Sequence, residues 1–204
     1  MNDVYQDRYI SHQARKKRQL TLSEGTTATP LPKGDQKALL RILAHRRSQR
    51  VFNGAPLPKG ALDKILDAAT TSPNSCNRHG VLIKVVTDRR EKELLTGLLV
   101  GGVGWIHRAD TVLLFLTDPA AYKSPNEKDF MHYCDVGFKA MSMWLVAETL
   151  GIGVSYINPN LTHPAIFRER YGDHVFCGAL ALGCYDRDRR AEKADRPERT
   201  DLLV

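Results

Sequence analysis

The sequence predicts a mixed α and β fold built around one central sheet. Three observations support this prediction: apolar runs of strand length, amphipathic stretches between them, and connections rich in glycine and proline. Helical and strand-like segments are interleaved along the chain, which is typical of a sheet covered by helices. With 204 residues, 42% of them hydrophobic and 26% charged, the chain can form one such domain with a short extension.

The elements of the predicted domain begin near Asp35, a plausible N-cap for a helix whose apolar positions include Leu39, Leu40, Ile42 and Leu43. Further helices are expected at 58–70, 89–100, 129–150 and 162–172, and the helix at 89–100 runs into the glycines of GGVGW (101–105). Strands are expected at 81–88, 111–118, 154–158 and 175–185. The strands 81–88 and 111–118 are so apolar that both are expected to be buried.

The first 34 residues are expected to form a separate part of the chain. Residues 1–20 carry a helical pattern that ends in the basic run ARKKR (14–18), and residues 22–34 are rich in Thr, Pro and Gly, as linkers are. The predicted organisation is therefore an N-terminal helical extension and linker at 1–34, followed by a globular domain at 35–204.

Composition restricts the class of protein. No apolar run approaches the roughly 18 residues of a membrane span, and the N-terminus is too polar for a signal peptide, so a cytoplasmic protein is expected. Cys76, Cys134, Cys177 and Cys184 have no C-x-x-C spacing, which favours reduced, mostly buried thiols and no metal site. The net charge of +7 admits anionic partners, but no nucleic-acid module is recognisable, so nucleic acid is unlikely as a partner.

The segment HRRSQRVF (45–52) concentrates positive charge directly after an apolar helix. Arg46 and Arg50 would share a helix face and repel by about 0.2–0.5 kcal/mol, and the helix dipole would offset part of that cost. Two interpretations remain open. The cluster is either a basic cap on a surface helix, or a clamp in which guanidinium groups and the Ser48 hydroxyl bind an oxyanion such as phosphate.

The loop TTSPNSCNRHG (70–80) gathers uncharged polar side chains between a helix and a strand. Turn chemistry accounts for Ser, Pro and Asn in such a loop. The same set of donors and acceptors would also suit a polar ligand. It comprises Ser72, Asn74, Ser75, Asn77 and His79.

Taken in order, these segments resemble the FMN-dependent nitroreductase family. The similar pieces are RRSQRVF (46–52) with the family's Arg-Arg-Ser-x-Arg-x-Phe signature, the helix, Ser/Pro/Asn loop and strand at 56–86, AETLGIGVSYIN (147–158), GALALGCY (178–185) and DRPERTDLL (195–203). The resemblance extends over residues 38–204. Each piece is short, and it is their order and spacing together that are specific.

The resemblance implies an α+β three-layer sandwich with a central, mostly antiparallel sheet flanked by helices, assembled as an intertwined homodimer. FMN would lie at the subunit interface. A hydride would pass from NADH or NADPH to the flavin and then, in a ping-pong sequence, to an electron-poor acceptor such as a nitro compound or a quinone. The flavin carries this chemistry, so neither a catalytic side chain nor a metal is expected. Extensions such as residues 1–34 would wrap the partner.

The resemblance also assigns site residues. Arg46, Arg47 and Ser48 would hold the FMN phosphate, with Arg196 closing over it beside Lys193. Arg50 would reach the ribityl chain or the pyrimidine edge, where a cation stabilises the reduced flavin. The other expected contacts are Asn74, Ser75 and Asn77 from the second subunit, Gly102 near the pyrimidine edge, Tyr156, Ile157 and Asn158 near N5, and His79, Trp105 and Tyr122 with the substrate. Tyr122 falls in the segment 119–130, which is either a lid or an ordinary loop before the long helix.

Two departures from the family pattern bear on substrate contacts. Cys76-Asn77-Arg78-His79-Gly80 stands where many members have Gln-Pro after the Asn, and Asn158 stands where glutamate is frequent. Three alternatives therefore remain: a specialised flavin enzyme of the same fold, such as a reductive dehalogenase or a flavin-fragmenting enzyme; a flavin-binding protein without reductase activity; and a basic protein that binds nucleic acid or a nucleotide.

Overall fold

The computed structural model describes residues 11, 14–15, 29–122, 125–160 and 164–203, and the chain divides into two compact units, 1–39 and 40–204. Most of the expected N-terminal extension lies outside the described residues. Helix α2 spans Lys33–His45 and so begins before Asp35, not after it. The Pro32 carbonyl accepts the first helical hydrogen bonds, from the backbone N–H groups of Asp35 and Gln36, which places Asp35 in the first turn.

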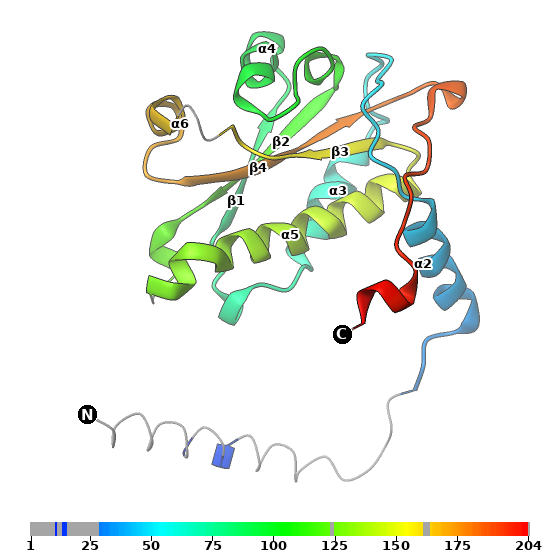
Figure 1. Cartoon of the computed structure of the whole chain (residues 1–204), viewed down its shortest axis with the longest axis horizontal. Coiled ribbons are helices and arrows are strands. Elements are labelled where there is room, and N and C mark those ends of the chain that lie inside the picture. Colours follow the sequence, from blue (N-terminus) through cyan, green and yellow to red (C-terminus); the bar gives the residue numbers. More distant parts are fainter. Residues whose placement is uncertain (1–10, 12–13, 16–28, 123–124, 161–163, 204) are drawn as a thin grey trace. The chain divides into compact units, whose positions relative to one another are not determined.

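The second unit contains a four-stranded antiparallel sheet in the order β1-β2-β4-β3 (Figure 1). Its strands are β1 (Val81–Val86), β2 (Thr111–Thr117), β3 (Gly153–Ile157) and β4 (Val175–Gly183). Strand β2 is buried at every position, as expected. The expected burial of β1 is wrong in part, because β1 is an edge strand that leaves Leu82 and Val85 exposed.

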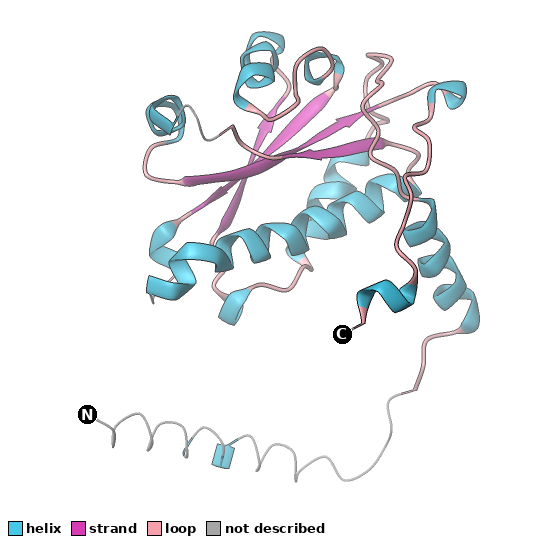
Figure 2. Cartoon of the chain, viewed as in Figure 1, coloured by secondary structure: helices cyan, strands magenta, loops and turns pink. Residues whose placement is uncertain are grey.

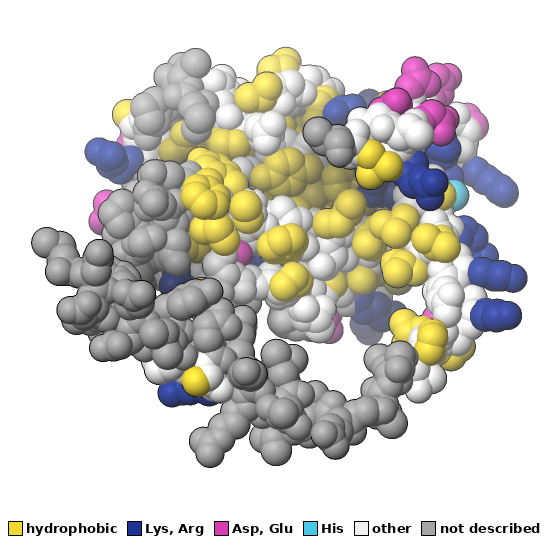
Figure 3. All heavy atoms as spheres, turned by 60° about the horizontal axis from the view of Figure 1, so that its bottom comes forward, with side chains coloured by type: hydrophobic (Ala, Val, Ile, Leu, Met, Phe, Trp, Pro, Cys, Tyr) yellow, Lys and Arg dark blue, Asp and Glu magenta, His cyan; other side chains and the backbone are white. Residues whose placement is uncertain are grey.

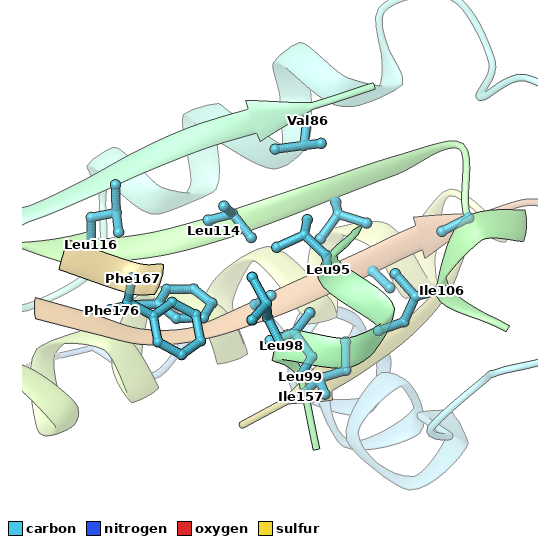
Figure 4. Close-up of a cluster of buried hydrophobic side chains, with 14 of the residues drawn as sticks. Val86, Leu95, Leu98, Leu99, Ile106, Leu114, Leu116, Ile157, Phe167 and Phe176 are labelled. Carbon is cyan, nitrogen blue, oxygen red and sulfur yellow. The ribbon is translucent and has the colours of Figure 1, made fainter. Parts of the chain in front are cut away.

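Helices cover both faces of the sheet (Figure 2). On one face lie α3 (Ala61–Thr70) and α5 (Pro125–Thr149), and on the other lie α4 (Arg89–Leu98) and α6 (Pro164–Tyr171). Side chains alternate along β2, so that Leu113 packs with α5 whereas Leu114 packs with α4 and α6. The three-layer α+β sandwich predicted from the sequence is confirmed. Figure 4 shows the core on the α4 side, where Leu95 and Leu98 meet Phe167 and Phe176.

Two further helix starts differ from expectation. Helix α3 starts at Ala61, three residues later than expected, because Pro58 and Gly60 form a turn in which Gly60 has a left-handed φ of 72°. Helix α5 starts at Pro125 and so takes up the second half of the candidate lid. Within the described residues, no helix is long and apolar enough to cross a membrane.

The cysteines are free, and their burial differs from expectation. Cys177 is buried, Cys184 is half-buried, and Cys76 and Cys134 are exposed. The expectation of mostly buried thiols is therefore wrong: Cys76 lies in the loop after α3, and Cys134 points away from the sheet on α5. Burial raises the pKa of Cys177 to about 11.

Gly178 is the glycine of β4 whose replacement we expect to be costly. Its φ is 146°, and a Cβ there would overlap the Tyr156 hydroxyl, which donates a hydrogen bond to the Cys177 carbonyl (2.9 Å). We expect Gly178→Ala to lower the free energy of unfolding by about 2 kcal/mol or more in urea titrations. As a control, Gly97→Ala in α4 places its methyl group in open space and should raise the free energy of unfolding by ~0.5–1 kcal/mol. Equal stability of the two variants would contradict this assignment.

Candidate functional site

A cavity of about 390 Å³ lies where the chain leaves α2 and the C-terminal segment passes beside it. Its lining residues are Arg46, Arg47, Ser48, Arg50, Ala191, Glu192, Lys193, Ala194, Asp195 and Arg196. Five of these side chains are cationic and two are anionic, so the cavity is suited to an anion. Guanidinium groups that converge from two segments are the usual means of binding phosphate.

Arg46 is held in place by an aromatic platform. Its guanidinium lies 4.7 Å from the centroid of the Trp144 ring on α5, a cation–π contact. Partial burial and the neighbouring charge of Arg196 lower the pKa of Arg46, while Glu148 acts in the opposite direction. The positive charge is thus incompletely balanced by the protein, and a bound anion would compensate for it.

The other arginines divide into two groups. Arg47 and Arg196 donate hydrogen bonds to backbone carbonyls at the end of α2, with Arg196 reaching the carbonyls of Leu43 and Ala44 at 3.3–3.4 Å. They therefore cap the helix C-terminus. Arg50 is exposed, and its side chain has no hydrogen-bond partner among the described residues. The helix-cap and anion-clamp interpretations of this cluster thus apply to different arginines.

Gln49 connects the two walls of the cavity, a role that no sequence motif indicates. Its side chain is 2% exposed; its Nε2 donates to the carbonyls of Val51 (2.8 Å) and Arg189 (3.0 Å), and its Oε1 accepts from the Ala191 N–H (2.7 Å). Its backbone N–H donates to Val154 of β3 (2.8 Å). Gln49 thereby fixes the C-terminal segment against residues 46–50.

We expect Gln49→Ala to lower the free energy of unfolding by about 2–4 kcal/mol, because three buried hydrogen bonds are lost and their backbone partners remain desolvated. Urea titration followed by circular dichroism measures this change. The matched control is Gln36→Ala, which removes an exposed glutamine side chain that donates to the Leu31 carbonyl and should cost less than about 0.5 kcal/mol. A Gln49 variant as stable as the control would show that the C-terminal segment is held elsewhere.

A second connection joins the C-terminal segment to α5. The Arg190 guanidinium donates to the Glu148 carboxylate (2.9 Å) and to the His45 carbonyl (2.8 Å). The pair is partly shielded from solvent, since the Glu148 side chain is 9% exposed and that of Arg190 is 26% exposed. Solvent screens a shielded ion pair less than an exposed one, so the attraction between its two side chains is stronger. The start of the cavity wall at 191–196 is thus held by two connections, one through Arg190 to α5 and one through Gln49.

The loop after α3 lies apart from this cavity, whose lining includes none of its residues. Within the loop, Asn74 accepts a hydrogen bond from the His79 N–H (3.0 Å), and both Ser75 donors reach Asp135 on α5 at 2.8 Å. Asn77 and His79 are exposed and have left-handed φ angles of 57° and 54°. The sequence expectation that loop and cavity meet across two subunits remains a prediction.

The end of β3 lies beside the glycine-rich connection that follows α4. The Val100 N–H donates to the Asn158 carbonyl (2.9 Å) and the Asn160 N–H to the Leu98 carbonyl (2.8 Å). Of the three residues expected near the flavin, Tyr156 and Ile157 of β3 and Asn158 directly after it, only Asn158 is exposed. Tyr156 packs on the α5 side and Ile157, 3% exposed, on the α4 side.

Gly102 and Trp105 are fixed by internal contacts. The Gly102 N–H donates to the Leu99 carbonyl (3.1 Å), and a Cβ there would overlap Ile106, so this glycine serves packing and offers no free N–H to a ligand. The expected backbone contact through Gly102 remains a prediction, and its N–H group is already used within the chain. The Trp105 indole N–H donates to the Gly101 carbonyl (2.7 Å). Its ring stays half-exposed 6.0 Å from that of Phe52.

Tyr122 lies in the interior and not on a lid. Its side chain is 1% exposed, and its hydroxyl donates to Asp135 (2.9 Å). Burial and that carboxylate raise its pKa. A substrate could reach this ring only if the packing opened, so Tyr122 is withdrawn as a substrate contact. Residues 123–124 of the candidate lid lie outside the described residues.

Comparisons with known proteins agree with this fold. Residues 43–103 match the model of the Nitroreductase family. The chain is 28% identical to an FMN reductase [NAD(P)H] of Bacillus subtilis (strain 168) over 177 residues, which covers 78% of this chain and 70% of the relative.

Two solved structures share the fold. The NADPH:FMN oxidoreductase from Vibrio harveyi, complexed with NAD+, has a TM-score of 0.73 at 22% identity and covers 82% of this chain and 76% of its own. A putative nitroreductase in complex with FMN from Desulfovibrio desulfuricans has a TM-score of 0.71 at 18% identity, and the match covers 87% of this chain and 97% of that structure's chain. The fold is that of the nitroreductases. The resemblance to the nitroreductase family, expected from the signature at 46–52, is confirmed by these matches.

Proposed function

We propose that the chain is an FMN-dependent NAD(P)H oxidoreductase that reduces an electron-poor small molecule, such as a nitro compound or a quinone. The observation that carries this proposal is the cation-lined cavity at Arg46, Arg47, Ser48 and Arg50, formed by the segment that resembles the family's phosphate signature. The names of the relatives, an FMN reductase [NAD(P)H] and an NADPH:FMN oxidoreductase, support the same cofactor and the same electron donors.

The residues present fit a phosphorylated flavin. Arg46 carries a charge that the protein balances incompletely, and Arg50 lines the cavity with a guanidinium that has no hydrogen-bond partner among the described residues. The indole N–H of Trp144, directly below Arg46, is buried and has no partner among the described residues. We assign Arg46 and Ser48 to the phosphate and Arg50 to the ribityl chain or pyrimidine edge. Lys193 adds charge, and Arg47 and Arg196 fix the backbone around the anion.

When bound, FMN supplies the hydride chemistry at its N5 atom. The chain's own part is to orient the flavin, to leave one face free for donor and acceptor in turn, and to place a cation near the pyrimidine edge. Asn158 and the ring of Trp105 are the partly open side chains that we assign to the surroundings of that face, and His79 to the substrate. No side chain is required to form a covalent bond.

A homodimer is part of the proposal, because α5 presents an apolar face that the chain itself leaves uncovered. Phe130, Tyr133, Phe138 and Met141 are between 43% and 53% exposed at helical spacing. Figure 3 shows hydrophobic side chains gathered on the side of the molecule that carries this helix. A patch of this kind is typical of an interface. Burying it against a second copy would bring the loop at 74–79 of one subunit to the flavin of the other.

The first experiment is the visible spectrum of the purified protein after incubation with FMN and desalting, before and after anaerobic addition of NADH or NADPH. We expect a retained flavin band that is bleached by at least one of the two donors. Retention without bleaching would favour a flavin carrier. A folded protein that retains no flavin would contradict the proposal. The cytoplasmic location expected from the sequence remains a prediction.

A further inference from the structure

Asp135 is a fully buried carboxylate on α5, with an exposure of 0%. It accepts three hydrogen bonds. Its Oδ1 accepts from the backbone N–H and from the hydroxyl of Ser75, both at 2.8 Å, and its Oδ2 accepts from the Tyr122 hydroxyl at 2.9 Å. A buried charge is costly unless it is paired and hydrogen-bonded. Its three donors all come from two loops, so this carboxylate acts as an anchor for those loops.

The loop after α3 is attached to α5 at a second point, one helical turn along. Lys139 is 6% exposed, lies at i+4 from Asp135, and donates through its ammonium group to the Ala69 carbonyl (2.7 Å) in the last turn of α3. Desolvation lowers the pKa of Lys139, and the charge of Asp135 opposes that shift. Together the two residues fix both ends of the segment from Ala69 to Ser75.

The same carboxylate joins the loop to the connection that follows β2. Gly80 packs so closely on that connection that a Cβ would lie 2.7 Å from the Cβ of Ala121 and 3.2 Å from the Tyr122 hydroxyl. The Asp118 N–H donates to the Gly80 carbonyl (2.9 Å). The two loops are therefore packed and hydrogen-bonded to each other, and Asp135 binds both of them.

The residues that follow Ser75 adopt a strained conformation. Cys76, Asn77 and His79 all have left-handed φ angles, 52°, 57° and 54°, which non-glycine residues rarely adopt. Such strain persists when the surroundings enforce it. The side chain of Asn77 is exposed and, within the described residues, makes no hydrogen bond. The side chains of Asn74 and Ser75, by contrast, form hydrogen bonds with other residues of the chain. Asn77 is thus the loop amide that is left to bind a ligand.

We propose that Asp135 is a positioning residue of the flavin site: by holding Ser75 it fixes the strained loop that presents the Asn77 amide to the cofactor bound by the other subunit. The inference rests on the proposed FMN site and dimer. It also changes the role of Ser75, which was expected to contact the flavin directly. Both Ser75 donors are used by Asp135, so Ser75 acts as the anchor point of the loop.

The test is a double-mutant cycle on FMN affinity, measured by quenching of flavin fluorescence when apo-protein of the full chain is titrated with FMN. Asp135→Asn keeps the shape of the side chain and removes its charge. We expect Asp135→Asn and Asn77→Ala each to raise the FMN Kd about tenfold, and the double variant to be no weaker than Asn77→Ala alone. A merely structural effect of Asp135 would be additive, giving about a hundredfold increase.

Lys92→Met is the matched control. Lys92 is 8% exposed on α4, and its ammonium group donates to the carbonyls of Ala109 (2.7 Å) and Asp110 (2.9 Å), so the change also removes one buried charge. It should lower the melting temperature and leave the FMN Kd unchanged. If Asp135→Asn does not fold, Ser75→Ala, which removes one of the three hydrogen bonds, takes its place in the cycle.

The outcomes separate the inference from the function on which it rests. If the parent protein binds no FMN, the proposed function fails. If the parent binds FMN, additive effects or an unchanged Kd in the Asp135 or Ser75 variant overturn the positioning role and leave the proposed function standing.

Discussion

Arg46→Ala should weaken FMN binding by about 100-fold or more, because it removes a guanidinium fork worth two charge-assisted hydrogen bonds at ~1.5–3 kcal/mol each. The cavity has other cations, but Arg46 is the one whose charge is held over Trp144 and poorly balanced by its surroundings. The FMN Kd is measured by fluorescence titration. A lysine at this position keeps the charge and loses the fork, so Arg46→Lys should fall between the parent and the alanine variant.

Riboflavin makes this prediction specific to the phosphate. The parent protein should prefer FMN to riboflavin, and Arg46→Ala should lose most of that preference while its riboflavin affinity changes little. The matched control is Arg89→Ala on α4, which removes an exposed arginine paired with Glu93 (2.9 Å) and lowers the net charge by the same amount. Preserved discrimination between the two flavins in the Arg46 variant would contradict the assignment of Arg46 to the phosphate.

The arrangement of the cavity was predictable from sequence where the signal is local. Arg46, Arg47, Ser48 and Arg50 fall within five residues, and their spacing resembles a known signature. Arg196 was predictable only through the resemblance, since it is 150 residues from the Arg46 carbonyl that it contacts. The structure adds that Arg47 and Arg196 cap α2.

Other residues could not be predicted because their partners are distant in sequence or their chemistry is common to many turns. Gln49 looks like a variable position of the signature, and only its contact with Ala191, 142 residues away, shows its role. Asp135 stands beside Cys134 on a helix and gives no sign of its link to Ser75, 60 residues earlier. Tyr122 was misassigned because a polar segment with Pro and Tyr is typical of both lids and ordinary connections.

The strand and helix types were predictable because hydrophobic period and length agree for each of them. Burial was harder to predict for elements that lie at an edge. The apolar run of β1 indicated an interior strand, but its place beside β2 alone leaves Leu82 and Val85 exposed. In the same way α5 is apolar around much of its circumference, and sequence alone does not say which residues face the sheet. Tyr133 and Phe138 do not face the sheet, and both are exposed. Their exposure is the basis of the prediction for Phe138→Glu.

Phe138→Glu should separate the proposed dimer into monomers. Phe138 is 49% exposed in the apolar face of α5, and two copies of that face would meet in a symmetric interface, so each dimer would carry the substitution twice. Burying an unpaired carboxylate there is strongly unfavourable, and we expect the dimer Kd to rise by about 1000-fold or more. Analytical ultracentrifugation at micromolar concentration measures the change. FMN retention should fall with it, because a monomer lacks the partner's loop.

The matched control separates loss of this interface from the general effect of a surface charge. Leu94→Glu introduces the same charge at a leucine that is 37% exposed on α4, on the opposite side of the sheet, and should leave both the dimer and the flavin in place. Circular dichroism should show that both variants are folded. A Phe138→Glu protein that stays dimeric with bound FMN would place the interface on another face. A Phe138→Glu monomer that still holds FMN tightly would instead show that one chain alone completes the site, and the loop at 74–79 would then need another role.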